Sequence, residues 1–290
     1  MTSPADVEQF TELRPLLFAI AYRMLGSAAD ADDILQDAYI RWAQRGPAEV
    51  SSPRGFLTTT VVRLCLDELK SARKRRERYV GPWLPEPLLV DDHDGAAAAE
   101  MADSLSMAFL VLLEELAPHE RAGLLLHDVF GYGYDEVAGM LGRTEPAARQ
   151  LVRRARQRVG ERRRRFDADR EQSERLAERF LEACSTGDIQ GLMAMLAEDV
   201  VVWTDGGGKA KAAPNPIYGA AKSARFLAAI AATIPAGAEV RTSRVNGQPG
   251  LVISDSTAVH GVIALDVIDG QIVGVRAVVN PEKLGHVPTG

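Results

Sequence analysis

Cysteine is nearly absent from the sequence: the 290 residues contain two, Cys65 and Cys184. Both lie within apolar patterns of helical spacing, which favour two buried thiols over a disulfide or a metal site. This scarcity argues against a disulfide-stapled scaffold and against a zinc site built from clustered cysteines. We expect no metal and no cofactor.

Long apolar runs are also missing. No stretch approaches the roughly 18 apolar residues of a membrane-spanning helix. The first ten residues, MTSPADVEQF, lack the basic and then apolar pattern of a secretory signal. No internal repeat is present. We therefore expect a cytoplasmic protein that does not contact membranes.

Size and charge suggest several domains and a local nucleic-acid surface. With 46% hydrophobic residues, the 290-residue chain is long enough for two or three domains. The net charge of −6 argues against nucleic acid, but positive charge is concentrated in two runs, and a local basic face suffices for phosphate contact. The runs contain Lys70, Arg73, Lys74, Arg75, Arg76 and Arg78, and the arginines between Arg149 and Arg165.

The second basic run has the pattern of a DNA-reading helix. A helix is predicted over 144–165: Thr144 is a good N-cap, Pro146 suits a first turn, and an apolar stripe of helical spacing runs from Ala148 to Val159. A shorter amphipathic helix is predicted over 134–141, and Gly142 ends it. A short helix, a tight turn and a basic helix are typical of a helix-turn-helix, and arginine and glutamine read base edges. A solvated basic helix in an ordinary bundle is the alternative.

Three amphipathic helices are predicted before this unit, over 7–24, 28–45 and 54–78, with a loop over 46–53. The second helix has a polar outer face. Acids in a first turn also suit the helix dipole, so N-terminal stabilisation is the alternative to a binding role for this face. The face contains Asp32, Asp33, Gln36 and Asp37.

A proline-rich segment separates the two helical parts. Three prolines between positions 82 and 87 forbid a regular helix, and an acidic, alanine-rich stretch follows, so we predict a linker over 79–103. Trp83 and the leucine after it would expose apolar surface in a free linker, which predicts that this piece docks on another part of the protein. Helices are then predicted over 104–116 and 120–130.

The pattern changes after residue 170. Two short turn pairs, Asn246-Gly247 and Asp269-Gly270, are strong hairpin signals between β-rich runs. We predict a curved antiparallel sheet with helices packed on it, an α+β cone. The helices are predicted over 172–186, 188–196 and 219–233, and the strands over 200–204, 239–246, 250–253, 258–267 and 272–279.

Together, the helical parts resemble the extracytoplasmic-function (ECF) sigma factors of bacterial RNA polymerase. The stretch DADDILQDAYIRWAQ is similar to the family's polymerase-binding helix, and SPRGFLTTTVVRLCLDELKSARKRRE to its helix for the downstream promoter element. The stretch HERAGLLLHDVFGYGYDEVAGMLGRTEPAARQLVRRARQRV resembles region 4. The resemblance implies an all-α region 2 over 1–78 and an all-α region 4 helix-turn-helix over 104–165.

The resemblance also implies partners and binding residues. The partners would be promoter DNA and core RNA polymerase, through its beta-prime clamp and beta flap. The loop over 46–53 and the third helix would engage the minus-10 element, where the family captures an unstacked base. Polymerase binding is expected at Asp32, Asp33, Gln36 and Asp37, minus-10 binding at Arg63, Lys70, Arg73, Lys74, Arg75 and Arg76, and minus-35 binding at Arg149, Gln150, Arg153, Arg154 and Arg156.

The part over 170–290 resembles the SnoaL-like branch of the NTF2-like superfamily. The whole chain resembles the SigJ-like subfamily, whose marks are present as WLPEP, DGGGK and NPEKL. We predict that these motifs pack the extension on the sigma core, and that the extension regulates the sigma factor in place of a separate anti-sigma factor. The residues expected at this contact are Trp83, Leu84, Pro85, Glu86, Pro87, Asp205, Gly206, Gly207, Gly208, Lys209, Asn280, Pro281 and Lys283.

Relatives of the cone fold include cyclases and isomerases, so the cone could instead hold chemistry or a small ligand. Asp205 and His260 are the candidate bases, but aspartate is a common turn former before glycines, and a lone strand histidine is usually structural. No second carboxylate is suitably placed for acid/base pairing. We expect no catalytic residue and no enzyme activity. The alternative is a DNA-binding regulator with a ligand-binding or enzymatic SnoaL-like domain.

Overall fold

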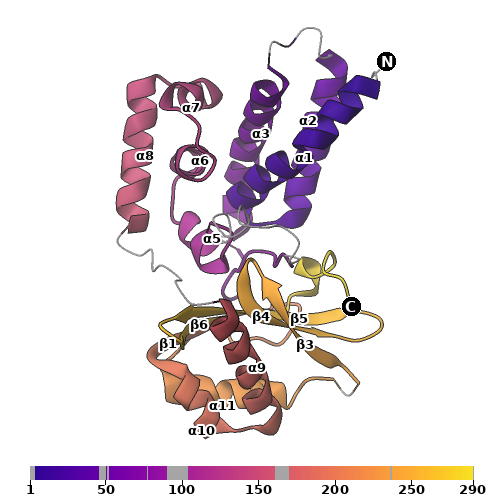
Figure 1. Ribbon diagram of the computed structural model, residues 1–290, viewed down its shortest axis with the longest axis vertical. Helices are drawn as coiled ribbons and strands as arrows, with labels where there is room; N and C mark the ends of the chain where they lie inside the picture. The colour runs from indigo at the N-terminus through magenta and orange to yellow at the C-terminus, as the bar shows by residue number, and fades with distance from the viewer. Residues whose placement is uncertain are drawn as a thin grey trace. The chain divides into compact units, whose positions relative to one another are not determined.

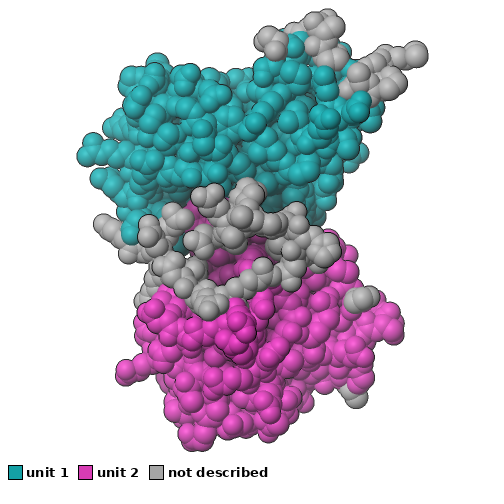
Figure 2. All heavy atoms as spheres, viewed as in Figure 1, with its two compact units in different colours: residues 1–77, 110–163 teal, residues 78–109, 164–290 magenta. Residues whose placement is uncertain are grey.

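The computed structural model describes residues 4–45, 50, 52–76, 78–89, 104–160, 170–235 and 237–289 (Figure 1). The chain divides into two compact units (Figure 2). Unit 1 contains residues 1–77 and 110–163, and unit 2 contains residues 78–109 and 164–290. No helix in the described stretches is long and apolar enough to cross a membrane.

The amino-terminal part of unit 1 consists of three packed helices. They are α1 (Pro4–Leu25), α2 (Ala28–Arg45) and α3 (Pro53–Arg76). Their apolar faces meet around the fully buried Trp42, whose indole N–H donates to the Asp6 carbonyl at 3.0 Å. The three helices that the sequence predicts here are therefore present.

Two arginines from different parts of unit 1 cap the carboxyl end of α1. Arg76 donates to the Leu25 carbonyl at 2.6 Å, and Arg121 donates to the Met24 carbonyl at 2.7 Å. Glu114 pairs with both guanidinium groups, at 2.7 Å from Arg121. Cations at a helix C-terminus satisfy its free carbonyls and oppose its dipole. This cluster therefore joins the regions that the sequence separates as regions 2 and 4.

The remaining helices of unit 1 end in the helix-turn-helix. Gly142 adopts φ +62° and ends α7, so that α8 begins after a short turn. The predicted helix over 120–130 begins earlier, because Pro118 occupies its first turn, and it ends in a π-helical segment. The elements are α5 (Met107–Leu113), which crosses the border between the units, α6 (Pro118–Leu124), the π-helix η2 (Leu125–Val129), α7 (Tyr134–Leu141) and α8 (Glu145–Gly160).

Unit 2 is a six-stranded sheet with three helices packed on one face (Figure 1). The helices are α9 (Arg170–Thr186), α10 (Ile189–Met195) and α11 (Ala220–Ala231), and Phe180 of α9 is fully buried in the core. The strands are β1 (Leu196–Asp205), β2 (Ile217–Tyr218), β3 (Glu239–Val245), β4 (Gln248–Ser254), β5 (Val259–Ile268) and β6 (Gln271–Val278), followed by the 3-10 helix η3 (Pro281–Lys283).

The prediction of a wholly antiparallel sheet is wrong at one pair. The strand order is β2-β1-β6-β5-β4-β3, and β1 runs parallel to β6, with Val202 opposite Val275. Hairpin signals predict only antiparallel pairs of strands that follow each other in sequence. The strands β1 and β6 are the first and last long strands of the unit and share no turn, so these signals could not predict their parallel pairing. The two predicted hairpins, β3–β4 and β5–β6, are present.

Both cysteines are free thiols, as the sequence predicts. Cys65 is buried in α3 and Cys184 is half-buried in α9. Burial raises the pKa of Cys65 far above its usual range and raises that of Cys184 to about 12. Each thiol is therefore protonated at neutral pH and packs as a small apolar group.

Candidate nucleic-acid and regulatory sites

The basic helix α8 buries its apolar stripe and presents its arginines to solvent. Ala148, Val152 and Ala155 are fully buried. Within the described residues, Gln150 and Arg153 have no hydrogen bond or ion pair to a side-chain partner, so both are available to a ligand. The minus-35 candidates Arg149, Gln150, Arg153, Arg154 and Arg156 are all exposed.

Three of these arginines have acidic partners: Arg154 lies 3.9 Å from Glu120, and Arg149 and Arg156 are held at hydrogen-bond distance. Arg149 donates to Glu145 at 2.6 Å and lies 4.3 Å from the centre of the Tyr134 ring. Arg156 donates two hydrogen bonds to Asp128, at 2.6 and 2.9 Å, and this pairing raises the Arg156 pKa. Bidentate pairs fix a guanidinium in one orientation. Arg149 and Arg156 are therefore less free to turn toward a base than Arg153.

The polar face of α2 is open. Asp32 pairs with Arg14 at 2.7 Å, but both side chains are more than half exposed, so this bridge contributes little stability. Asp33, Gln36 and Asp37 are also exposed on the same helix. The polymerase-binding candidates thus form one accessible acidic surface.

The minus-10 candidates are in different environments. Lys70 is exposed beside Asp67, at 2.8 Å, whereas Arg76 belongs to the cap of α1. Arg76 is therefore a structural residue in this arrangement of unit 1, which the basic run alone could not indicate. The side chains of Arg73, Lys74 and Arg75 lie outside the described residues.

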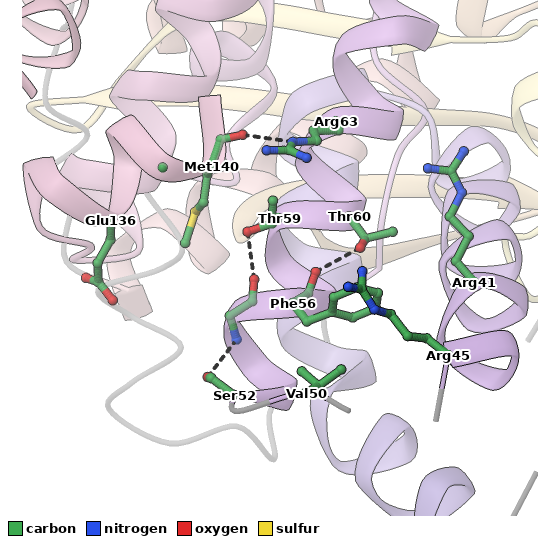
Figure 3. Close-up of a pocket in the computed structure, with 12 residues that line it drawn as sticks. Arg41, Arg45, Val50, Ser52, Phe56, Thr59, Thr60, Arg63, Glu136 and Met140 are labelled. Carbon is green, nitrogen blue, oxygen red and sulfur yellow. Dashed lines mark hydrogen bonds between the residues drawn. The ribbon is translucent and has the colours of Figure 1, made fainter. Parts of the chain in front are cut away.

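An open cavity of about 650 Å³ lies beside the first half of α3 (Figure 3). Three guanidinium groups, several hydroxyls and the half-buried Phe56 ring line it, which suits a nucleotide with its phosphate. Residues of α7 form the opposite wall. The lining residues are Arg41, Arg45, Val50, Ser52, Gly55, Phe56, Thr59, Thr60, Arg63, Glu136, Gly139 and Met140.

Hydrogen bonds between α3 and residues 132 and 140 hold the α7 wall of the cavity against α3. Arg63 donates to the Met140 carbonyl at 3.4 Å (Figure 3). The buried Tyr132 hydroxyl lies 3.2 Å from the Thr58 hydroxyl and accepts from Arg54 at 3.4 Å. Region 4 therefore packs on the same stretch of α3 that the resemblance assigns to promoter binding.

Asp205 lies at the centre of the three motifs WLPEP, DGGGK and NPEKL in unit 2. Its carboxylate is fully buried at the end of β1 and accepts from the Tyr79 hydroxyl at 2.6 Å, the Leu84 N–H at 2.7 Å and the Lys283 ammonium at 2.8 Å. A buried carboxylate requires such partners. One side chain thus joins residues 79–89, which we call the strap, to the sheet and to the carboxyl-terminal segment.

The partners of Asp205 also contact one another. The Lys283 ammonium lies 4.3 Å from the Trp83 ring centre and 4.8 Å from the Tyr79 ring centre, both cation–π contacts. Asn280 donates to the Tyr79 hydroxyl at 2.8 Å. Burial, and then the bond to Asp205, raise the pKa of Tyr79, so its hydroxyl stays protonated and donates. Sequence analysis did not identify Tyr79, which precedes the motif by four residues.

The glycines of DGGGK allow this close approach. A Cβ at Gly207, where φ is +56°, would lie 2.3 Å from the Asn280 amide and 2.7 Å from the Tyr79 hydroxyl. A Cβ at Gly206 would lie 2.4 Å from the Ala210 carbonyl oxygen. Lys209, by contrast, makes an exposed bridge to Glu282 at 3.0 Å.

The rest of the strap is also docked. Leu84, Pro85, Glu86 and Pro87 are buried, and the Pro87 carbonyl lies 2.7 Å from His286 Nε2. Pro281 occupies the first turn of η3, which Asn280 caps. The structure therefore brings WLPEP, DGGGK and NPEKL together within unit 2.

The candidate bases of the cone have structural partners. Asp205 points away from the core face of β1, which carries Val200 and Val202. His260 bonds Asp255 at 2.6 Å in the turn before β5. Among the described residues, no cluster of three or more His, Cys, Asp or Glu side chains could hold a metal.

Family models match all three parts of the chain. Sigma-70 region 2 matches residues 9–75, Sigma-70 region 4 matches residues 106–159, and a SnoaL-like domain matches residues 177–275. These matches agree with two helical sigma regions followed by an α+β domain.

Curated relatives match nearly the whole chain. It is 35% identical to the ECF RNA polymerase sigma factor SigJ of Mycobacterium tuberculosis (strain ATCC 25618 / H37Rv), over 98% of this chain and 94% of the relative. It is 30% identical to the probable ECF RNA polymerase sigma factor SigI of Mycobacterium tuberculosis (strain CDC 1551 / Oshkosh), over 93% and 92%. The crystal structure of the M. tuberculosis SigJ protein superposes with a TM-score of 0.78 at 33% identity, covering 98% of this chain and all of that one.

Proposed function

Because the chain belongs to the extracytoplasmic-function RNA polymerase sigma factors, we propose that it directs core RNA polymerase to promoters under the control of its own SnoaL-like domain, without a separate anti-sigma factor. The observation that carries this proposal is the docking of the strap on Asp205. The strap lies in the only stretch of chain between region 2 and region 4. A domain that holds it limits how those regions move.

Promoter binding requires regions 2 and 4 to separate. The minus-10 and minus-35 elements differ in position by about 25 base pairs, which is about 85 Å of B-form DNA. In unit 1, α3 contacts α7 through Arg63 and Met140, and α6 through the cap of α1. This compact unit is consequently a resting state, and the nucleotide-sized cavity beside α3 is partly covered in it.

Three surfaces of the described chain are candidates for binding polymerase, the minus-10 element and the minus-35 element. The polar face of α2 would bind the polymerase, and the cavity beside α3 would receive the unstacked minus-10 base once α7 moves away. The exposed face of α8 would read the minus-35 element. A small ligand in the cone is not part of this proposal, because the described side chains that pack between the sheet and the helices are apolar.

Replacing Arg153 with alanine should weaken binding to the cognate minus-35 element by about 1–3 kcal/mol and relax its sequence preference. Arg153 is exposed and free to make a bidentate contact to guanine. Competition binding of the holoenzyme to cognate and mutated elements measures this effect. Arg156→Ala is the matched control, since Asp128 already holds Arg156, and it should affect all sequences alike. Equal loss of preference in both variants would contradict the assignment.

Replacing Leu84 with aspartate should release the strap and raise promoter-dependent initiation by limiting amounts of the protein severalfold. Leu84 is 1% exposed and its backbone N–H bonds Asp205, so an aspartate there would bury a carboxylate that has no cation of its own. Run-off transcription with purified core polymerase measures the effect. Val80→Asp is the control, because Val80 belongs to the same strap but is 63% exposed. If Leu84→Asp, still folded by circular dichroism, initiates like the wild type, regulation by the SnoaL-like domain is refuted.

A further inference from the structure

Asn246 lies in the turn between β3 and β4, belongs to none of the three motifs in sequence, and is fully buried. Its φ of +52° is the left-handed conformation that an Asn-Gly hairpin turn requires. A turn residue is usually exposed, and a buried amide must find hydrogen-bond partners. The sequence predicts the turn but gives no reason for this burial.

The hydrogen bonds of Asn246 go to both ends of one chain segment. Its N–H donates to the Leu88 carbonyl at 2.7 Å, and its Oδ1 accepts from the Leu88 N–H at 2.9 Å. Its Nδ2 donates to the Leu105 carbonyl at 3.0 Å. The Leu88 N–H can only donate, so it fixes which side of the amide faces Leu105. A β-bridge between Leu89 and Val245 extends the contact at the first end.

We infer that Asn246 is a positioning residue that sets how far apart the two promoter-binding regions can move, by clasping together both ends of the segment between Leu88 and Leu105. We call these three hydrogen bonds the Asn246 clasp. This inference rests on the proposed function, because it assigns to the SnoaL-like domain a specific means of control.

The length of the clasped segment determines how much the clasp limits the separation of region 2 and region 4. While the clasp is closed, residues 89–104 add nothing to the separation of region 2 and region 4, because their ends are held at one side chain. When it opens, these residues can add up to about 50 Å, at about 3.3 Å per residue. That is more than half of the separation between the promoter elements. We therefore expect the clasp to open when both regions reach the promoter.

The first test replaces Asn246 with glycine. Glycine keeps the left-handed turn and the N–H bond to Leu88, but it removes the side-chain bonds to Leu88 and Leu105. In run-off transcription with core polymerase, on a promoter selected from random DNA with the wild-type protein, we expect a severalfold to tenfold higher initiation rate at limiting sigma factor. A residue with only a structural role would not raise the rate when it is removed.

The matched control is Asp269→Gly. Asp269 is the other non-glycine residue with positive φ in the described chain, at +49°, and it also precedes a glycine in a hairpin. It is exposed, and none of the hydrogen bonds found there reaches the strap. Initiation should stay within about twofold of the wild type. An unchanged or lower rate in folded Asn246→Gly protein would overturn the inference.

A second test does not depend on the folding of that variant. Deleting residues 91–100 from the otherwise wild-type chain leaves both ends of the clasp intact and shortens the reach by about 33 Å. We expect initiation to fall at least tenfold. If transcription is unaffected, the clasp stays closed during initiation and the inference is wrong. A rise in Leu84→Asp without one in Asn246→Gly would reject the clasp alone and leave the proposed function intact.

Discussion

Replacing Asp205 with alanine is expected to lower the free energy of unfolding of unit 2 by about 3–5 kcal/mol, the usual cost of leaving a buried charge unpaired. Asp205 is fully buried, and the side chain of its partner Lys283 is only 9% exposed. The Tyr79 hydroxyl and the Leu84 N–H lose their acceptor in the same change. Native-state amide exchange measures the loss, because it reports the strands of unit 2 separately from the helices of unit 1.

The control for Asp205 lies in the same motif. Lys209→Ala breaks the bridge to Glu282, whose side chains are 55% and 66% exposed, and should cost no more than about 1 kcal/mol. Lys283→Met combined with Asp205→Ala should cost less than the sum of the single changes, because no charge is then left buried alone. Additive losses, or a loss for Asp205→Ala as small as that for Lys209→Ala, would show that the carboxylate is not the centre of the contact.

Replacing Glu114 with glutamine is expected to destabilise unit 1 by about 3–5 kcal/mol and to separate region 2 from region 4. Glu114 is 19% exposed and is the counter-charge for Arg76 and for Arg121, which is 3% exposed. Burial lowers the pKa of Arg121 to about 9, a sign of what it costs to remove this guanidinium from water. Faster amide exchange at the end of α1 and in α6 would report the separation.

Asp67→Asn provides the control for this effect. It breaks the exposed pair with Lys70 on α3, whose side chains are 75% and 67% exposed, and should leave exchange in α1 and α6 unchanged. If the two variants exchange alike, Glu114 does not hold the regions together. Faster exchange in Glu114→Gln, with initiation raised in parallel, would connect the compact form of unit 1 to the resting state of the sigma factor.

Local patterns predicted the helices well, because each helix buries a stripe that is visible in the sequence. The stripe of α8, from Ala148 to Val159, is buried as its spacing predicts. Contacts between distant segments were harder to predict. The strands β1 and β6 pair in parallel without a connecting turn, so no local sequence signal predicts their pairing. Arg76 caps α1, but in the sequence nothing distinguishes it from the other residues of its basic run.

The contacts around Asp205 were predicted in part. The three motifs were recognisable by resemblance, and the structure brings them together around Asp205. Tyr79 and Asn246 were missed, because a tyrosine before a linker and an asparagine before a glycine have ordinary local explanations. A buried asparagine in a turn becomes informative only when its partners are known, and Leu105 lies 141 residues away in the sequence.

The pairing of β1 with β6 also has a consequence for the order in which the proposed regulatory contacts form during protein synthesis. β6 and Lys283 leave the ribosome long after region 2, the strap and region 4, and domains generally fold as units during synthesis. Until they emerge, β1 lacks its inner neighbour and Asp205 lacks its cation. If the SnoaL-like domain restrains the sigma regions as proposed, a nascent chain passes through a period in which both regions are complete and that restraint has not yet formed.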